Sequence, residues 1–235
     1  MVSAEHTSKH FDAELEAVRA KVLQMGGLVE SQIRLAIEAL VNGDVSQMNR
    51  VINNDHRVNA MEVEIDEICN QIIALRQPAA GDLRMVMTVI KTITDLERIG
   101  DEAEKIARMG KLLSQRKSLI LPSFTEIRHA AELALDMLRK SLDAFARLDL
   151  AYAAQVVRQD QMVDEEFRSI MRYLITFMME DPRTISTALE ILFVAKAIER
   201  IGDHAKNMSE YVVYMVKGKD VRHVTVEEIE REVSG

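Results

Sequence analysis

The sequence of 235 residues contains no tryptophan, one cysteine, three prolines and nine glycines. The single cysteine, Cys69, cannot form an internal disulfide and fits a reducing cytoplasm. Proline and glycine interrupt regular structure. Their scarcity beside abundant Ala, Leu, Met, Glu and Arg therefore predicts an all-α protein. Four tyrosines and six phenylalanines leave few side chains that could stack on nucleic-acid bases.

Other absences narrow the class of protein. No apolar run approaches the ~20 residues that a membrane span requires. The N-terminal residues, with Glu5, His6 and Asp12, lack the basic start and apolar core of a signal peptide. The net charge of −8 argues against a nucleic-acid partner. The sequence also shows no glycine-rich phosphate loop and no pairing of a nucleophile with a base. These features favour a cytoplasmic protein without a membrane span.

One five-residue segment occurs twice, as Glu97–Asp101 and as Glu199–Asp203, with the sequence ERIGD each time. A repeat of this length is improbable by chance and indicates an internal duplication. In a helix the two acids of each copy lie about 40° apart around the axis, where they repel each other. The residues at helical steps before them are apolar, so the acids are predicted to face the core. Such acids need protons, cationic partners or a metal.

The apolar periodicity and its interruptions predict six long helices. Their expected ranges are about 9–41, from a cap at Asp44 to 76, 81–113, 123–147, 150–180 and 183–216. A single long coiled coil is disfavoured by breaks at 42–44, 77–81, 114–122, 148–149 and 181–182. Three antiparallel helices per half bury one stripe per helix most simply. We therefore predict two tandem, pseudo-symmetric antiparallel three-helix bundles, at 9–113 and 123–217, with a tail at 218–235.

A second set of acids lies on the middle helix of each predicted bundle. Counted from Pro78, Asn59 and Glu97 are each 19 residues away, and Asp55 and Asp101 are each 23 residues away. The second half shows the same arrangement around Pro182. Acids on two helices should therefore meet at one level, and oxygen ligands suit magnesium, manganese, calcium or iron, with zinc a further candidate. The predicted metal ligands are Asp55, Asn59, Glu97, Asp101, Asp160, Asp164, Glu199 and Asp203.

Simpler interpretations of these residues stay open. Asp101 could form an ion pair with Lys105, and Asp203 with Lys206. The glycine inside each ERIGD copy could leave room for an ion or allow close helix packing. His129, in Glu126-x-x-His129, has the spacing of half a di-iron motif, but no second copy occurs and His129 is expected at the surface. His204 is a weak ligand candidate because it points about 100° away from Asp203.

Further motifs resemble the PhoU family of bacterial phosphate-signalling regulators. They are the two ERIGD copies, Gln77-Pro78 followed by Asp82-Leu83-Arg84, Asp181-Pro182-Arg183, Phe11–Leu15 with Met25-Gly26-Gly27, and Tyr214–Gly218. The resemblance covers about residues 9–223. It implies two three-helix bundles with metal bound by acid-x-x-x-Asp pairs. The pair Asp55/Asn59 departs from that pattern, which is expected to lower the charge and the metal affinity of the site in the first half.

The resemblance also implies a function. It implies no enzyme activity, but a negative regulator of phosphate uptake that relays phosphate sufficiency from the phosphate ABC transporter to a membrane sensor kinase. The expected partners are the ATPase subunit of the transporter, the sensor histidine kinase and a second copy in a homodimer. The alternative is a carboxylate-bridged, ferritin-like metal oxidoreductase, which the missing second Glu-x-x-His disfavours. A purely structural helical protein is a third hypothesis.

Overall fold

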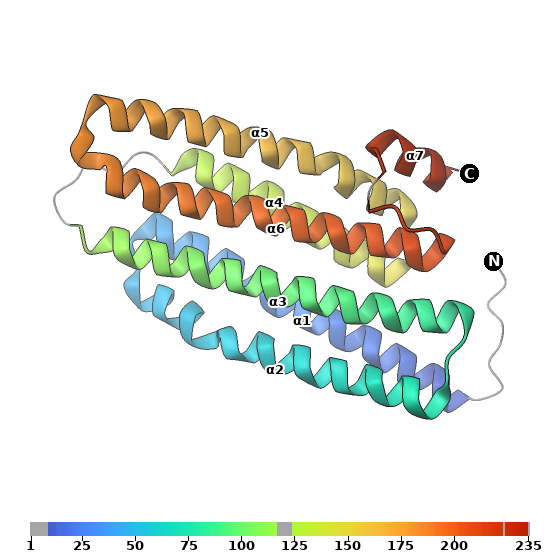
Figure 1. Cartoon of the computed structure of the whole chain (residues 1–235). Helices are drawn as coiled ribbons and strands as arrows, with labels where there is room; N and C mark the ends of the chain where they lie inside the picture. Colours follow the sequence, from blue (N-terminus) through green and yellow to red (C-terminus); the bar gives the residue numbers. More distant parts are fainter. Residues whose placement is uncertain (1–8, 117–123, 223, 235) are drawn as a thin grey trace.

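The computed structural model describes residues 9–116, 124–222 and 224–234, and these residues form helices and connecting segments without a strand (Figure 1). The first half contains three long helices and the second half repeats the arrangement. A short helix follows near the C-terminus. The bounds are α1 Lys9–Asn42, α2 Val45–Arg76, α3 Ala80–Ser114, α4 Thr125–Arg147, α5 Leu150–Glu180, η1 Pro182–Thr184, α6 Ile185–Lys217 and α7 Val226–Ser234.

The turns of the two halves use matching chemistry. Asp44 accepts a hydrogen bond from the Gln47 backbone N–H at 3.0 Å and thereby caps α2. Asp149 caps α5 in the same way, accepting from the Ala151 N–H at 2.8 Å. Helix α2 ends where Gln77 adopts a left-handed conformation before Pro78. Helix α5 ends at Asp181, and Pro182 begins the 3₁₀ turn that leads into α6.

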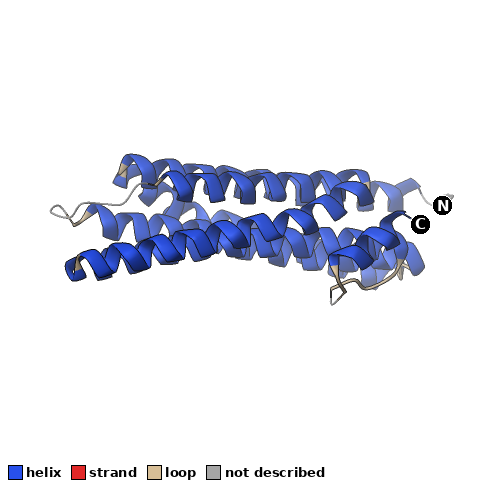
Figure 2. Ribbon diagram, turned by 90° about the horizontal axis from the view of Figure 1, so that it is seen from above, coloured by secondary structure: helices blue, strands red, loops and turns tan. Residues whose placement is uncertain are grey.

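Helices α3 and α6 form the centre of the molecule. They run antiparallel and side by side, with α2 and α5 on the outside and α1 and α4 behind them (Figure 1). The view from above shows the long helices running nearly parallel to one long axis (Figure 2). One continuous apolar cluster fills both halves, and Ile99 and Ile201 of the two ERIGD copies are fully buried in it. Both repeats therefore share a core, with α3 and α6 at the contact between them.

The predicted fold class is confirmed, and the helix bounds agree closely with those expected from the breaks. The first helices of the two halves differ in length, since α1 has 34 residues and α4 has 23. The predicted connector at 114–122 lies outside the described residues from 117 onward. The tail contains the helix α7, whose Ile229 is buried against α5. Among the described residues, no helix is long and apolar enough to cross a membrane.

Candidate functional site

The acids of the first half lie close enough to affect one another along the line where α2 packs against α3, and this line is called the first-half groove. A Cβ atom placed on Gly100 would lie 3.3 Å from Val58 Cγ1 and 3.6 Å from Asp55 Oδ1. Asp55 therefore lies opposite the first ERIGD segment, as the count of residues from Pro78 predicts. Asn59 donates a hydrogen bond to Asp55 Oδ2 at 3.2 Å. The remaining oxygens, Asp55 Oδ1 and Asn59 Oδ1, are buried from solvent and have no hydrogen-bond partner. Orphaned acceptors in this groove are groups that a cation would satisfy.

The carboxylates of this groove repel one another. Burial raises the pKa of Glu97 above its ordinary value, and the charges of Asp101, Glu62 and Asp55 raise it further. Burial followed by the charge of Asp55 raises the pKa of Asp101 in the same direction. Within the described ranges, none of Asp55, Glu97 and Asp101 forms an ion pair. The groove therefore concentrates negative charge that the protein itself leaves unneutralised.

The acids of the second half are arranged similarly but carry their own cations. The Lys196 ammonium contacts both carboxylate oxygens of Glu199 at 2.5 Å. The Lys206 ammonium lies 2.8 Å from Asp160 Oδ2. Asp203 is exposed at one edge, yet partial burial and the neighbouring carboxylates, Glu199 first, raise its pKa to about 6. This groove contains less uncompensated charge than the first.

Asp164 completes the second-half set and faces Arg168, with 3.5 Å between the carboxylate and the guanidinium. The two ERIGD copies are 102 residues apart, so Lys196 and Lys206 of the second half correspond to Thr94 and Glu104 of the first half. The two grooves thus share acids but differ in cations. Aligning the two halves residue by residue would have revealed this difference from the sequence.

Several expectations about these residues need correction. The ERIGD acids do not face the core: Asp101 and Asp203 are exposed and Glu97 is half-buried, because the isoleucine of each copy takes the core-facing position. Lys105 pairs with Glu102 at 3.2 Å and leaves Asp101 free, while Lys206 reaches across to Asp160 rather than to Asp203. Among the described residues, no three His, Cys, Asp or Glu side chains form a ready-made metal cluster.

The glycines of the ERIGD copies allow close helix packing. A Cβ at Gly202 would lie 3.4 Å from Val163 Cγ1, much as one at Gly100 would contact Val58. Each glycine therefore brings the middle helix of its half against the ERIGD helix, which places the acids of the two helices at one level. His129, as expected, is exposed, with 3.7 Å between its Nε2 and Glu166.

A buried polar contact between the halves was not foreseen. Asp95 on α3 and His204 on α6 are both buried, and His204 Nδ1 lies 2.7 Å from Asp95 Oδ1. Asn207 adds a weaker contact to the same oxygen at 3.4 Å. His204 is therefore a structural residue of the α3–α6 interface. The spacing within one helix could not show this, because the partner belongs to the other half.

A pH dependence follows from Glu210, which is only 6 % exposed on α6. Burial raises the pKa of Glu210 from 4.5 to about 7. Between pH 4.5 and about pH 7 the folded protein therefore holds a proton on Glu210 that the unfolded chain has lost. The free energy of unfolding should fall as the pH rises through this range. We expect a loss of about 2 kcal/mol between about pH 5 and about pH 8 by urea unfolding. Glu210→Gln should lessen this slope, and an unchanged slope would contradict the assignment.

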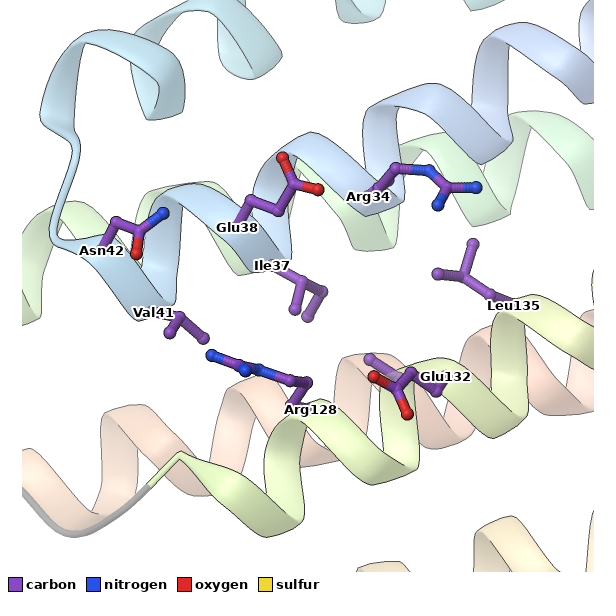
Figure 3. A pocket seen from close by; sticks show the side chains of 9 residues that line it. Arg34, Ile37, Glu38, Val41, Asn42, Arg128, Glu132 and Leu135 are labelled. Atoms are coloured by element: carbon purple, nitrogen blue, oxygen red, sulfur yellow. The ribbon is translucent and has the colours of Figure 1, made fainter.

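A hollow lies between α1 and α4, on the opposite side of the molecule from α3 and α6. It has a volume of about 330 Å³. Figure 3 shows Ile37, Val41 and Leu135 between the charged side chains of the two helices. At the other end of the same contact, Gly26 is pressed closely against Leu142. The hollow is thus the open end of the α1–α4 contact, and its mixed charges select no ligand class.

A duplicated three-helix bundle with acid-lined grooves at equivalent levels defines a tandem-repeat helical protein. A family model described as PhoU domain matches residues 22–109 and 127–212 of the chain. The chain therefore belongs to the PhoU family, whose members are accessory and regulatory proteins rather than enzymes.

Similar proteins cover most of the chain. A relative from Serratia marcescens, named phosphate-specific transport system accessory protein PhoU, is 50% identical over 96% of this chain and 92% of its own length. The protein of the same name from Escherichia coli K12 is 48% identical over 98% and 95%. The crystal structure of PhoU from Pseudomonas aeruginosa covers 89% of this chain and all of its own, with 45% identity and a TM-score of 0.85.

A more distant structure shares the same fold. The phosphate transport system regulatory protein PhoU from Streptococcus pneumoniae is 28% identical, with a TM-score of 0.83, and covers 90% of this chain and 99% of its own. The arrangement of the two bundles is therefore retained at low identity.

Proposed function

We propose that the chain is a cytoplasmic accessory protein of phosphate transport that restrains the phosphate-starvation response when phosphate is plentiful. The observation that carries this proposal is the match of nearly the whole chain, at up to 50% identity, to proteins named for that transport system. The match includes both repeats, so the proposal concerns the protein as a whole rather than one domain.

The proposed partners are the ATPase subunit of the phosphate ABC transporter and a membrane sensor histidine kinase. Both present surfaces at the cytoplasmic side of the membrane. The net charge of −8 disfavours direct adsorption to an anionic bilayer, so recruitment to the membrane should depend on these protein partners. We also propose that the chain forms a homodimer, which light scattering of the purified protein would test.

A transcriptional reporter tests the proposed function. Deleting the gene should leave a phosphate-starvation promoter active in phosphate-rich medium, because the sensor kinase loses its restraint. The measurement is reporter activity at high phosphate in the deletion strain, beside the same strain complemented with the intact gene. A reporter that stays silent in the deletion strain would show that the assignment to phosphate signalling is wrong.

We further propose that the acid grooves bind metal ions and that, contrary to the expectation from Asn59, the first-half groove binds them more tightly. Carboxylate and amide oxygens at Asp55, Asn59, Glu97 and Asp101 suit a hard or intermediate cation such as Mg²⁺, Mn²⁺ or iron. Two of these oxygens are buried and unpartnered, and within the described part of the chain no lysine forms an ion pair with these residues. In the second half, a metal at Asp160, Asp164, Glu199 and Asp203 must displace Lys196 and Lys206. A bound cation would add charge compensation and join α2 to α3.

The proposed order of metal affinity, first half above second half, is tested by measuring the metal bound to two double variants. The variant Glu97→Gln with Asp101→Asn should lose the tighter Mn²⁺ site, while Glu199→Gln with Asp203→Asn should retain it. Lys196→Met should tighten the second-half site, since the competing ammonium is removed. Elemental analysis of untagged protein and calorimetric titration with Mn²⁺ provide the measurements. Metal should also raise the midpoint of thermal unfolding of the wild-type chain. Equal binding by both paired variants would disprove the proposed order.

The ferritin-like alternative makes a separate prediction of oxygen consumption by iron-loaded protein. The family to which the chain belongs favours the regulatory role. A cation in these grooves would then act by holding α2 against α3 and α5 against α6, without a redox step.

A further inference from the structure

Exposed apolar side chains gather on the central helix pair near the turn between α5 and α6. Helix α3 packs against α1, α2 and α6, and helix α6 packs against α3, α4 and α5, so each has one uncovered side. Toward the α5–α6 turn, four large apolar residues of these two helices are between 41% and 51% exposed. They are called the turn-end patch and are Leu112 of α3 and Ile185, Leu189 and Phe193 of α6.

An ion pair between the two helices fixes the level at which these residues lie. Arg200 Nε on α6 is 3.0 Å from the Glu102 carboxylate on α3. The helices are antiparallel, and Figure 1 shows the end of α3 and the start of α6 at the same end of the molecule. Leu112 comes ten residues after the acid of this pair, and Leu189 comes eleven residues before its arginine. The two leucines therefore lie at the same level on neighbouring helices.

The α6 residues of the patch are spaced as the contact stripe of a helix pair requires. They follow one another at intervals of four residues, which is about 6 Å along a helix. A second helix that lies along α6 repeats its own side chains at the same interval. Met109 and Leu192, on the same two helices, are partly buried and extend the apolar surface toward the core. Adjacent exposed apolar residues of this kind mark an interaction surface.

Basic side chains border the patch toward the middle of the molecule. Each lies three to seven residues from Leu112 or Phe193, and they are Lys105, Arg108, Lys196 and Arg200. Their side chains are 37–56% exposed, whereas those of the acids that pair with them are only 7–22% exposed. The surface beside the patch therefore presents cations to the solvent, although the chain as a whole has a net charge of −8.

The first repeat lacks this combination at its equivalent positions. The counterparts of the three α6 residues, 102 positions earlier, are Leu83, Met87 and Lys91. The ammonium of Lys91 lies 5.4 Å from the ring centres of Tyr211 and Tyr214, so a cation replaces the exposed phenylalanine. The counterparts of the four bordering bases are Asn207, Glu210, Thr94 and Arg98, of which only the last is basic. The apolar patch with its basic border thus belongs to one end of the molecule and is not a property of the repeat.

We propose that the turn-end patch binds an acidic amphipathic helix of a partner protein. The apolar stripe of that helix would pack on Leu189 and Phe193, and its carboxylates would face the bordering bases. The proposal rests on the proposed function, which supplies the partner proteins, and it names the surface and the chemistry through which one of them binds. An anionic bilayer is the less suitable occupant, because the net charge of the chain opposes adsorption.

A designed peptide tests the patch on the full-length protein. The peptide has about 18 residues, or five helical turns, with leucine at every third or fourth position and glutamate and alanine elsewhere. The control peptide has lysine in place of glutamate. By fluorescence anisotropy, we expect the acidic peptide to bind about tenfold more tightly, and added salt should weaken its binding. The net charge of the chain predicts the opposite order, so this result separates the local charge from the overall charge.

Two double variants locate the binding site of the peptide. Leu189→Ser with Phe193→Ser should weaken binding of the acidic peptide about tenfold, because both apolar contacts are lost. Leu83→Ser with Met87→Ser is the matched control at the equivalent positions of the first repeat, where both residues are 39% exposed, and it should leave binding unchanged. Arg108→Gln should weaken binding about threefold, as expected for a charge at the rim of an interface. Circular dichroism checks that each variant is folded.

Several outcomes would overturn the proposal. They are absence of saturable binding of the acidic peptide, tighter binding of the lysine peptide, and equal losses in the two double variants. Light scattering that shows a wild-type dimer and a monomeric patch variant would identify a second copy as the occupant. Binding to phosphatidylglycerol vesicles that the patch variant loses would identify the membrane instead.

The proposed partners separate failure of the patch from failure of the proposed function. Of the purified ATPase subunit and the cytoplasmic part of the sensor kinase, at least one should bind the wild-type chain and bind the patch variant about tenfold more weakly. Equal binding of wild type and variant by these partners would reject the patch and leave the proposed function standing. A silent reporter in the deletion strain, together with peptide binding that depends on the patch, would reject the proposed function alone.

Discussion

Replacing His204 with leucine should destabilise the protein by about 3–5 kcal/mol, because it leaves the buried Asp95 carboxylate without its main partner. Asn207, at 3.4 Å, is too distant to compensate for that loss. Tyr211 also hydrogen-bonds Asp95, but burial and then Asp95 raise its pKa, so it stays a neutral partner. Since Asp95 and His204 belong to different halves, the effect should appear in the cooperative unfolding of the whole chain. Urea unfolding followed by circular dichroism measures it.

The matched control is His129→Leu, which removes an exposed histidine with a 3.7 Å contact to Glu166 and should change stability by less than about 0.5 kcal/mol. The double variant Asp95→Leu with His204→Leu provides a stricter test. It removes both members of the buried pair, so most of the lost stability should return. A double variant as unstable as the single one would show that shape at this position, rather than the unpaired carboxylate, determines the cost.

The sequence predicts the helices well because their ends have local causes. Asp44 and Asp149 cap the helices that follow them, and Pro78 and Pro182 lie in the turns before the ERIGD helices. Counting from these prolines also places Asp55 opposite the first ERIGD segment. Caps and turn residues act within a few positions of the chain, so reading them requires no knowledge of how the two halves pack.

The ion pairs were less predictable because each lysine can reach several acids. Lys206 lies three residues from Asp203 in the sequence but pairs with Asp160 on the neighbouring helix. Lys105 likewise chooses Glu102 over Asp101. Long, flexible side chains select partners according to the shape of the groove, which helical spacing does not determine. The metal sites therefore stay a prediction that rests on the residue types and on the unpartnered oxygens of the first half.

The contact between the two halves is the feature that the sequence predicts least. Asp95 and His204 are 109 residues apart, and each is preceded and followed by residues that would suit an ordinary helix. Only the antiparallel packing of α3 against α6 brings them together (Figure 1). A polar residue on a buried face is a signal that such a contact exists, but its partner emerges only from the fold.

A second large loss of stability is expected from substitutions at equivalent positions of the two repeats. Ile99 and Ile201 occupy the same position of the two ERIGD copies, and each is fully buried. Ile99→Ala and Ile201→Ala should therefore each destabilise the chain by about 3 kcal/mol, through lost burial and the cavity left behind. Because both halves share one core, each substitution should lower the stability of the whole protein rather than melt one half alone. Urea unfolding monitored at several probes measures both the size and the cooperativity.

Ile175→Ala is the control for this pair, since Ile175 is 46% exposed and its truncation should cost less than about 0.5 kcal/mol. If the repeats are equivalent, the two buried substitutions should agree within about 1 kcal/mol, despite the shorter α4 that covers the second half. A much larger cost at one position would mean that the halves differ in rigidity. A two-step unfolding curve in one variant would mean that α3 and α6 join two separately stable bundles, and the shared core would then be the wrong description.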